Sequence, residues 1–582
     1  MSVRNRWFLL FAALTSAALV LAAACGGDEE TTDKSPTAGK TAAATVAGGD
    51  QAPADQQKIT IQSGEPEFYD PHRSNFEQDI FVERMLFRAL YNLTDDGSGG
   101  VKVVPDAAAG EPTISGSVYT VKLKPGLKWS DGQPLTAKDF VYGFQRECDP
   151  DVASPYQYVL GAGLGDLKGC DDLYNNKDAA QKQALIDALG AKAIDDTTIE
   201  FTLNKPVATF TTIWSLWAAY PSRKDVIEKF GDKWTDPANI VTNGPFTLKE
   251  VVAKDHATLI PNPNWAGQKP ALQQITIKFI DDLSAAFKAF QNGELQATQI
   301  LATDSTVAKS DASLKNQLIL IASARITTIE VQMKDPVLGG TSSTDPKAYN
   351  LRLALSKAIN RQQLVDAAYD GVHAPALYWV VKGLKGFQGN EAFKAIDYDL
   401  EGAKKALVDA GYPGGQGLPT FKLIYRDTPE RRNEGDFLQK AWAAVGIKVE
   451  MQYVDSKARS AAFNSGEFQL FQGGWQLDYP DIENPLVGLF NTGGGNNKYN
   501  CSNPDVDKAY ADAAAATTED ARIKAYQAVE TAIIKNLCGA IPMYQDSVPF
   551  LVSSKLGGVG TNGVIHASEP GSYCAECWYV KK

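Results

Sequence analysis

The spacing of apolar and polar residues along this chain predicts a mixture of strands and helices. Between Tyr119 and Pro150, apolar positions 119, 121 and 123 alternate with polar ones, the period-two pattern of a half-buried strand. Thr136 stands where it would N-cap a helix, and Asp139, three residues later, completes a capping-box pattern. The same criteria predict strands over 58–63 and 198–203 and helices over 179–189 and 283–290.

In the second half of the chain, predicted strands and predicted helices alternate more regularly. Asn350 is placed to N-cap a helix over 351–359. Beyond it, the β-α-β-α-β order favours an α/β lobe with a partly parallel sheet. The predicted elements are strand 421–426, helix 430–445, strand 447–453, helix 457–464, strand 467–472, helices 504–514 and 520–535, and strands 540–544 and 548–552.

The first 25 residues have the features of a targeting segment. Arg4 and Arg6 precede an apolar run over 7–24, and small residues then lead to Cys25. This order is similar to a bacterial lipoprotein signal with cleavage before Cys25 and lipid on its sulfur and amine, although Ala22 stands where leucine is usual. An uncleaved membrane anchor is the alternative, because the run is nearly long enough to span a bilayer. Both interpretations place the bulk of the chain outside the cytoplasm.

Composition then separates a tether from the folded part. Residues 26–57 are rich in Ala, Thr, Gly and Asp, so we expect a flexible tether that spans roughly 30 Å. Residues 58–582 are too many for one hydrophobic core, which predicts two or three lobes. The net charge of −12 argues against nucleic acid as a partner.

Six cysteines follow Cys25, and an even number in an exported protein favours disulfides. Cys148 and Cys170 fall in one segment, so we predict that they pair. The pairing of the other four stays open, and the CxxC spacing of the last two raises a redox or metal site as an alternative. The four histidines are not at ligand spacing, which disfavours zinc, and we expect no cofactor. The unassigned cysteines are Cys501, Cys538, Cys574 and Cys577.

Short motifs spread from residue 58 to the C-terminus resemble, in order and spacing, the extracytoplasmic solute-binding proteins of peptide ABC importers. This is the oligopeptide/dipeptide-binding family. Each motif is weak alone, and the resemblance depends on their succession. They are Glu65-Pro66, Asp70-Pro71-His72, the 119–150 segment, Asn243-Gly244-Pro245-Phe246, Asn292-Gly293-Glu294, Arg352–Asn360, Ala410-Gly411-Tyr412-Pro413, Gly466-Glu467-Phe468, Gly474–Pro480 and Ala540–Tyr544.

The resemblance implies a two-lobed α/β fold with two hinge strands and an extra domain inserted in the first lobe. The hinges would lie near Thr327–Met333 and Ala540–Tyr544. Lobe I would comprise 58–87, 198–326 and 541–582, the extra domain 88–197, and lobe II 327–540.

The resemblance also indicates where a ligand would bind. Asp478 matches an aspartate that pairs with the ligand's α-ammonium, although an aspartate before Tyr-Pro is also typical of a turn. Trp475 would line the same pocket or pack in a core. Gly473 and Gly474 would leave the backbone open to a ligand strand or form a bulge.

Three further positions are weaker candidates for ligand contact. Glu65 and Tyr69 follow the first predicted strand, where Glu65 would otherwise be a solvated loop residue. Phe246 lies in a predicted hairpin and would face either the cleft or the core. Gln472 replaces an arginine that meets the peptide carboxylate in some relatives, and glutamine supplies no charge. Capture of the ligand's C-terminus is therefore open.

Together these observations predict a monomeric, lipid-anchored receptor that binds peptides by hinge closure and delivers them to an ABC permease with its ATPase subunits. It would lie on the outer face of the cell membrane. Alternatives are the same fold binding a sugar or metal chelate, or a surface lipoprotein for signalling or chaperoning. A hydrolase is disfavoured, because the sequence contains no GxSxG, HExxH or P-loop motif.

Overall fold

The computed structural model describes residues 50–95, 101–161, 164–516, 518–560 and 572–582. The described residues belong to one compact unit that covers 48–582. The predicted signal segment, the lipidation site Cys25 and residues 26–49 of the predicted tether lie outside the described residues.

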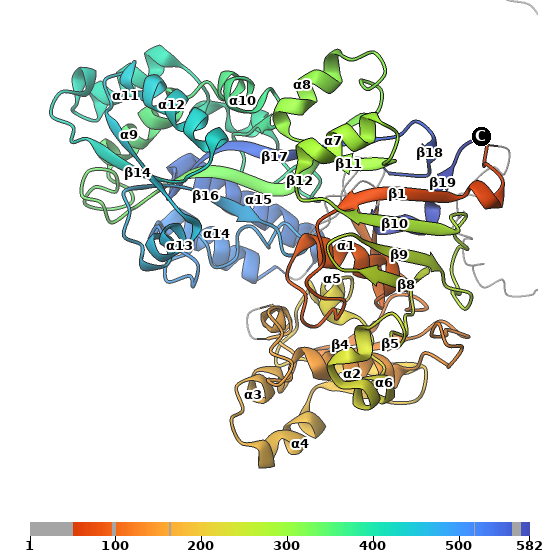
Figure 1. The fold of residues 1–582 in the computed structure, drawn as a ribbon. Helices are drawn as coiled ribbons and strands as arrows, with labels where there is room; N and C mark the ends of the chain where they lie inside the picture. The colour runs from red at the N-terminus through yellow and green to blue at the C-terminus, as the bar shows by residue number, and fades with distance from the viewer. Residues whose placement is uncertain (1–49, 96–100, 162–163, 517, 561–571) are drawn as a thin grey trace, which may run out of the picture. The chain divides into compact units, whose positions relative to one another are not determined.

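A mixed sheet of 11 strands connects the two halves of this unit (Figure 1). Its order is β15-β14-β16-β12-β17-β11-β1-β10-β9-β8, with β13 paired to β17. Strand β14 is parallel to both β15 and β16, and β1 is parallel to β10. The α/β prediction is therefore confirmed. The strands are β1 Lys58–Ser63, β8 Phe246–Val252, β9 His256–Pro261, β10 Gln274–Phe279, β11 Ala297–Gln299, β12 Leu318–Val331, β13 Ala374–Pro375, β14 Phe421–Arg426, β15 Val449–Val454, β16 Leu470–Gln476 and β17 Ala540–Val552.

The second half of the chain builds one large hydrophobic core from buried residues between Ile326 and Tyr544. Helix α9 begins at Pro346, because the side chain of Asp345 accepts from the N–H groups of Lys347 and Ala348. Asn350 therefore lies inside the helix, and its predicted role as N-cap is wrong. The helices around this core are α9 Pro346–Lys357, α10 Arg361–Tyr369, α11 Leu400–Asp409, α12 Pro429–Ala443, α13 Ser456–Ser465, α14 Pro504–Ala514 and α15 Glu519–Asn536.

A second core joins the first strands to the segment expected to be the extra domain. Within it, β4-β5-β7-β6 form a separate four-stranded sheet and β2 pairs with β3. Thr136 and Asp139 form the predicted capping box at the start of α2. The elements are α1 Glu77–Leu86, β2 Tyr91–Asp95, β3 Val101–Pro105, β4 Thr113–Ser115, β5 Val118–Lys122, α2 Ala137–Glu147, η2 Gln157–Val159, α3 Cys170–Tyr174, α4 Ala179–Ala188, β6 Ala191–Ala193, β7 Thr198–Thr202, α5 Phe210–Ile213 and α6 Lys224–Phe230.

A third, smaller core lies beneath α7 and α8, which cover Leu283–Gln291 and Ala302–Ser310. The side chain of Asp282 accepts from the backbone N–H groups of Ser284 and Ala285 at the start of α7. One of the adjacent acids at 281–282 is therefore a helix cap. This agrees with the preference for negative charge at a helix N-terminus.

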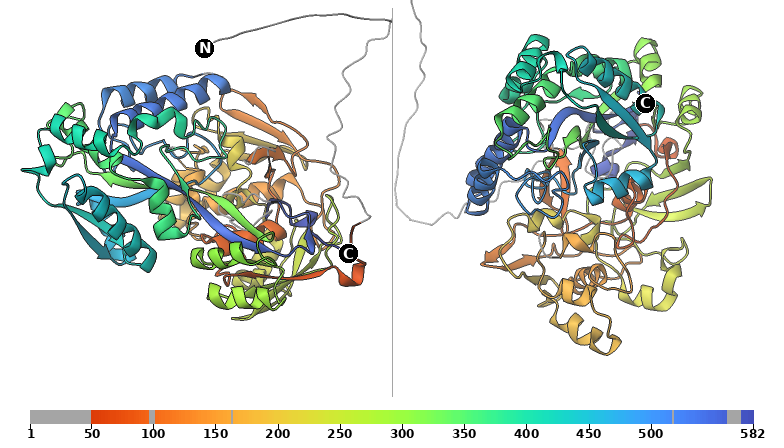
Figure 2. Two further views of the ribbon diagram at one scale, coloured as in Figure 1. Left: turned by 90° about the horizontal axis from the view of Figure 1, so that it is seen from above. Right: turned by 90° about the vertical axis from the view of Figure 1, so that its left-hand side faces the viewer.

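Strands β12 and β17 run side by side and join the cores (Figure 2). The predicted strands 540–544 and 548–552 are one continuous strand, since both parts pair with β12. The register between them shifts twice, between Ala322 and Ile326 and between Thr327 and Thr328. Before the first shift β12 pairs only with β17, and from Arg325 onward it also pairs with β16.

Three disulfides lie among the described residues. Cys148–Cys170 joins the end of α2 to the start of α3, as predicted. The remaining pairs, which the sequence left open, are Cys501–Cys538 and Cys574–Cys577. The CxxC motif thus carries a disulfide in this structure.

The last eight residues of the predicted tether are ordered, which corrects the boundary at residue 57. The backbone N–H of Ala52 donates to the carbonyl of Val580 at 2.8 Å. The buried side chain of Gln57 donates to Ala52 and Val580 carbonyls and accepts from the Val580 N–H. Composition missed this because hydrogen bonds to the C-terminal strand β19, Tyr579–Val580, hold the segment, with little apolar burial.

Candidate functional site

Asp478 lies just beyond β16, at the edge of the sheet where β14 and β16 both end. Ligands of open α/β sheets typically bind outside the carboxyl ends of parallel strands. The backbone N–H of Leu477 donates to the carbonyl of Ala324 at 2.9 Å, which ties this loop to the register shift of β12. The position of Asp478 is therefore coupled to the two strands that join the cores.

Asn484 holds Asp478 in place. Its Oδ1 accepts from the backbone N–H of Asp478 at 3.0 Å and from the indole N–H of Trp475 at 3.1 Å. Its Nδ2 donates to Oδ2 of Asp478 at 3.2 Å. Because Asn484 is itself buried, it fixes the carboxylate and the indole relative to each other.

A second donor reaches Asp478 from the other half of the chain. The hydroxyl of Tyr158, in η2, donates to Oδ1 of Asp478 at 3.1 Å. The Tyr158 ring lies 5.5 Å from the ring of Tyr156, which in turn meets Trp217 edge to face at 4.5 Å. Tyr158 is 43% exposed, so this aromatic group presents an accessible surface beside the carboxylate.

Burial raises the pKa of Asp478, and the hydrogen bonds from Asn484 and Tyr158 offset part of that rise. Burial, and then the nearby Asp478, raise the pKa of Tyr156 to about 12. The carboxylate is therefore held by neutral donors in a half-desolvated place. A cation that binds it would gain more there than in bulk water.

The structure brings Trp475 and Gly474 next to Asp478, as the sequence placed them. Trp475 is half-buried and packs against the larger core, so it combines a core contact with its bond to Asn484. Gly474 has φ +135°, and a Cβ there would lie 1.9 Å from the carbonyl oxygen of Ile326. A Cβ on Gly473 would lie 2.2 Å from the carboxylate of Glu330. Close packing against β12 thus accounts for both glycines.

Glu65 and Tyr69 belong to a different group of contacts. Glu65 Oε1 accepts from the backbone N–H of Lys254, in the turn between β8 and β9. Tyr69 packs against the second core, and burial, followed by Glu65 and Asp79, raises its pKa. Phe246 has no exposed surface, which favours the core interpretation over its predicted contact with ligand.

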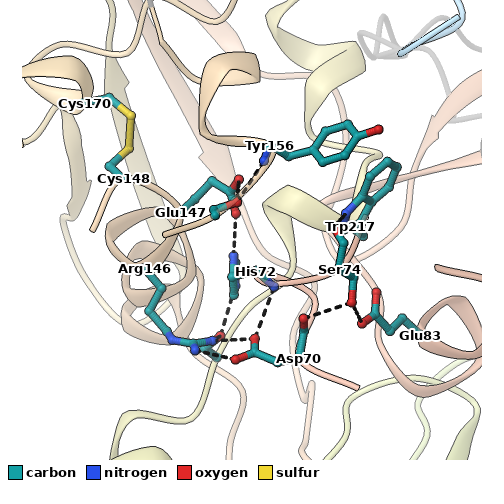
Figure 3. Close-up of polar contacts among 12 residues, drawn as sticks. Asp70, His72, Ser74, Glu83, Arg146, Glu147, Cys148, Tyr156, Cys170 and Trp217 are labelled. Carbon is teal, nitrogen blue, oxygen red and sulfur yellow. Dashed lines mark hydrogen bonds and ion pairs between the residues drawn. A yellow bond between two sulfur atoms is a disulfide. The ribbon is translucent and has the colours of Figure 1, made fainter. Parts of the chain in front are cut away.

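A buried polar network joins the segment after β1 to helix α2 (Figure 3). Arg146 donates to both carboxylate oxygens of Asp70, at 2.9 and 2.7 Å. His72 Nδ1 lies 2.9 Å from Glu147, and its Nε2 lies 3.1 Å from the hydroxyl of Ser222.

The Glu147–His72–Ser222 order resembles that of an acid, a base and a nucleophile in a hydrolase. His72 and Glu147 have no exposed surface, and Ser222 is 2% exposed. A substrate cannot reach these groups, so we interpret the network as a structural link between the two segments.

Neither a metal site nor a membrane span is evident in the part that the structure covers. The described residues contain no group of three or more His, Cys, Asp or Glu side chains arranged to hold a metal ion. Their helices include none that is long and apolar enough to cross a bilayer.

Comparisons with known proteins show which proteins this chain is similar to. The model of bacterial extracellular solute-binding proteins, family 5 Middle, matches residues 102–497. The periplasmic murein peptide-binding protein MppA of Escherichia coli is 27% identical over 526 residues, which cover 89% of this chain and 93% of that protein. The periplasmic oligopeptide-binding protein OppA of Salmonella typhimurium is 29% identical over 527 residues, with 90% and 93% covered.

A solved structure shares the fold. The unliganded open form of the murein tripeptide-binding protein MppA superimposes with a TM-score of 0.77 at 26% identity. The match covers 92% of this chain and 99% of that one. The two-lobed α/β fold class expected from the motifs is thereby confirmed.

Proposed function

The chain belongs to family 5 of the bacterial extracellular solute-binding proteins, and from that premise we propose that it captures peptides for an ABC importer. Members of this family are binding proteins of transporters and not enzymes. The ligand would bind between the two lobes, the lobes would close around it, and the closed form would deliver it to a membrane permease with its ATPase subunits.

The observation that carries the proposal is the fixed carboxylate of Asp478. Asn484 and Tyr158 hold it at the carboxyl edge of the sheet, where a peptide's α-ammonium can form a charge-assisted bond. Trp475 and Tyr158 supply aromatic surface beside it. The two relatives, whose names assign them murein peptides and oligopeptides, support peptides as the ligand class.

The lobe boundaries remain those expected from the motifs, with the closing motion placed on β12 and β17. The register shift between Ala322 and Ile326 interrupts the ladder where the two cores meet. A second register shift lies between Thr327 and Thr328. Because an interrupted ladder bends more easily than a regular one, we place the hinge of β12 over 322–328, which includes both shifts and reaches the expected 327–333 segment.

We also propose attachment to the outer face of the cell membrane through lipid on Cys25. The apolar run at 7–24 and the small residues before Cys25 support this. The protein would act as a monomer, since capture and delivery by hinge closure need only one chain.

A thermal-shift screen with a mixed peptide library tests the ligand class. A hundredfold excess of a bound peptide over its Kd should add about 2.7 kcal/mol to the free energy of unfolding. A sugar and metal-chelate panel is run in parallel. Stabilisation by one of those compounds, with none by any peptide, would overturn the peptide proposal while leaving the fold in place.

A further inference from the structure

The CxxC motif near the C-terminus carries the most accessible of the three disulfides among the described residues. Cys574 and Cys577 are half-buried. In the other two disulfides, no cysteine is more than 1% exposed. A thiolate must approach a sulfur atom directly in order to exchange with a disulfide. Access therefore distinguishes the pair in the CxxC motif from the two buried pairs.

The same pair closes the shortest loop. Its cysteines are 3 positions apart, whereas the separations in the other two disulfides are 22 and 37. The stabilisation that a disulfide gives by restricting the unfolded chain is smaller for a shorter loop. The two other pairs also belong to the two large hydrophobic cores. Opening Cys574–Cys577 therefore costs the fold less than opening either of them.

The disulfide fixes the turn that leads into β19. Both cysteines lie in η7, Ser572–Cys577, and β19 begins just after it at Tyr579. Strand β19 pairs with β18, Leu556–Gly557. The next residue, Gly558, packs so closely against the turn that a Cβ there would lie 1.9 Å from the carbonyl oxygen of Cys577. The conformation of the turn is thus coupled to both strands.

An ion pair inside the motif attaches the turn to the second core. The carboxylate of Glu576, which is 8% exposed, accepts from Arg88 at 2.7 Å, and Arg88 also lies 3.3 Å from Asp106. Trp578 is buried in the same core. These contacts do not depend on the S–S bond. Reduction should therefore loosen the turn and the strand after it without unfolding the core beneath.

Strand β19 in turn holds residues 50–57. The backbone N–H of Ala52 donates to the carbonyl of Val580, and that of Lys582 donates to the carbonyl of Asp50. Figure 1 shows the C-terminus beside the start of β1. We call the hydrogen bonds between residues 50–57 and the C-terminal strand the tether clamp. Because β19 has two residues and both are only half-buried, the clamp has little support beyond the turn that precedes it.

We propose that Cys574–Cys577 is a thiol–disulfide exchange site whose reduction opens the tether clamp. A thiolate of an extracytoplasmic dithiol protein attacks one sulfur, the S–S bond breaks, and the other cysteine leaves as a thiolate that takes up a proton. The second thiolate of the reductant then attacks the reductant's own sulfur in the mixed disulfide, which releases the second cysteine. Two electrons and two protons thus pass to the pair, and the reductant leaves as a disulfide.

Opening the clamp would change the tether and not the peptide site. In the proposed lipid-anchored form, release of residues 50–57 would lengthen the chain between Cys25 and the folded unit by up to about 28 Å when fully extended. The disulfide would thereby set how far the binding unit can move from the membrane. This consequence rests on the proposed attachment through Cys25, whereas the exchange site does not.

Pulse alkylation tests the exchange site. The oxidised protein is treated with dithiothreitol under native conditions, free thiols are trapped with iodoacetamide at intervals, and the alkylated peptides are identified by mass spectrometry. Cys574 and Cys577 should react at least about a hundredfold faster than the four cysteines of the buried disulfides. Reduced thioredoxin, itself a dithiol protein, should give the same order. Equal rates, or a faster reaction of either buried pair, would overturn the exchange site.

Hydrogen exchange tests the link to the clamp. Selective reduction should raise the exchange rates of peptides that cover 50–57 and 579–582 by about tenfold or more, and leave those of β1 and β10 unchanged. A chain with both Cys574→Ser and Cys577→Ser should show the fast rates without reductant and no further change with it. Unchanged rates at 50–57 after selective reduction of the wild-type protein would overturn the switch.

Gln57→Ala is the matched control. It removes the hydrogen bonds of the Gln57 side chain to Ala52 and Val580 but leaves the disulfide intact. Residues 50–57 should exchange rapidly in this variant with or without reductant, while its CxxC disulfide should keep the wild-type rate of reduction. If the double serine variant does not fold, the wild-type protein before and after reduction and this control still decide whether the disulfide governs the clamp.

Discussion

Two polar regions of this protein both contain arginines and carboxylates but differ in how their charges are paired. In the network between the segment after β1 and α2, Asp70 meets Arg146 through two hydrogen bonds, and His72 contacts Glu147 and Ser222. At the carboxyl ends of β14 and β16, Arg325 and Arg431 pair with Asp546 and Glu434. Their neighbours Arg426 and Arg459 have no carboxylate within ion-pair distance among the described residues. The charges of the first region are paired within the protein, and those of the second are paired only in part.

The difference separates stability from binding. A buried ion pair that is fully hydrogen-bonded fixes two segments, and removal of one partner leaves an uncompensated charge. We therefore expect substitutions in the network to change unfolding, and the substitution of Asp478 to change binding.

The largest effect should come from Arg146→Met, which leaves the buried carboxylate of Asp70 without its ion-pair partner. Burial alone would raise the pKa of Asp70, but Arg146 holds it below its usual value. The variant should lose about 3–5 kcal/mol of unfolding free energy in urea titrations. Lys508→Met, which breaks an exposed pair with Asp512, should lose less than about 1 kcal/mol. Similar losses for the two variants would erase the contrast between a complete network and surface charge.

Asp478→Asn should weaken the binding of peptides with a free amine by more than about tenfold and leave the urea midpoint nearly unchanged. The isosteric amide keeps one acceptor oxygen, which can face the Asn484 amide, while its NH2 group can donate to the Tyr158 hydroxyl, so the main loss is the charge. Because the pKa of Asp478 is raised, the charged form is lost as pH falls at a higher pH than for an ordinary carboxyl. Wild-type affinity should therefore decline on mild acidification, whereas that of the variant should not. Undiminished affinity of the variant in calorimetry would remove Asp478 from the amine-binding role.

Glu330→Gln tests how one buried carboxyl group changes the free energy of unfolding with pH. The pKa of Glu330 is about 8 in the folded protein, above its unfolded value, so the folded state binds the extra proton. The stability that the protonated Glu330 gives the wild-type protein should decrease as pH rises from about 4.5 to about 8. The variant should show no such decrease. From pH 5 to pH 9, urea titrations should show the variant gaining more than about 1 kcal/mol relative to wild type. A constant difference over that range would show that Glu330 is already ionised in the fold.

Tyr158→Phe should have the smallest effect, because it removes one neutral donor to Asp478. We expect about a threefold loss of affinity for free-amine peptides and a further rise in the pH at which binding declines. Calorimetry across pH measures both. Tyr174→Phe, at the end of α3, is the control and should leave both quantities unchanged. A loss of tenfold or more for Tyr158→Phe would indicate that the tyrosine itself contacts the ligand.

The sequence predicted most of the local structure because each pattern depends on residues a few positions apart. Strand β14 and helix α14 have the predicted bounds, and the capping box at Thr136 forms as expected. Helix α9 shows the limit of such criteria, since both Asp345 and Asn350 are good caps and only the side chain of Asp345 lies at the helix start. The two strands predicted within 540–552 are one, because continuous pairing with β12 overrides the local interruption.

What the sequence determined by itself was the family, through motifs in a fixed order, and the location of Asp478, Trp475 and Gly474 in one short segment. It also determined the Cys148–Cys170 disulfide, whose partners are near in sequence. The tertiary structure decided which distant groups meet. Tyr158 reaches Asp478 across 320 positions. Four arginines near the carboxyl ends of β14 and β16 come from two strands and two helices. No short-range pattern records such contacts, because they follow from where the parallel strands end and which helices begin there.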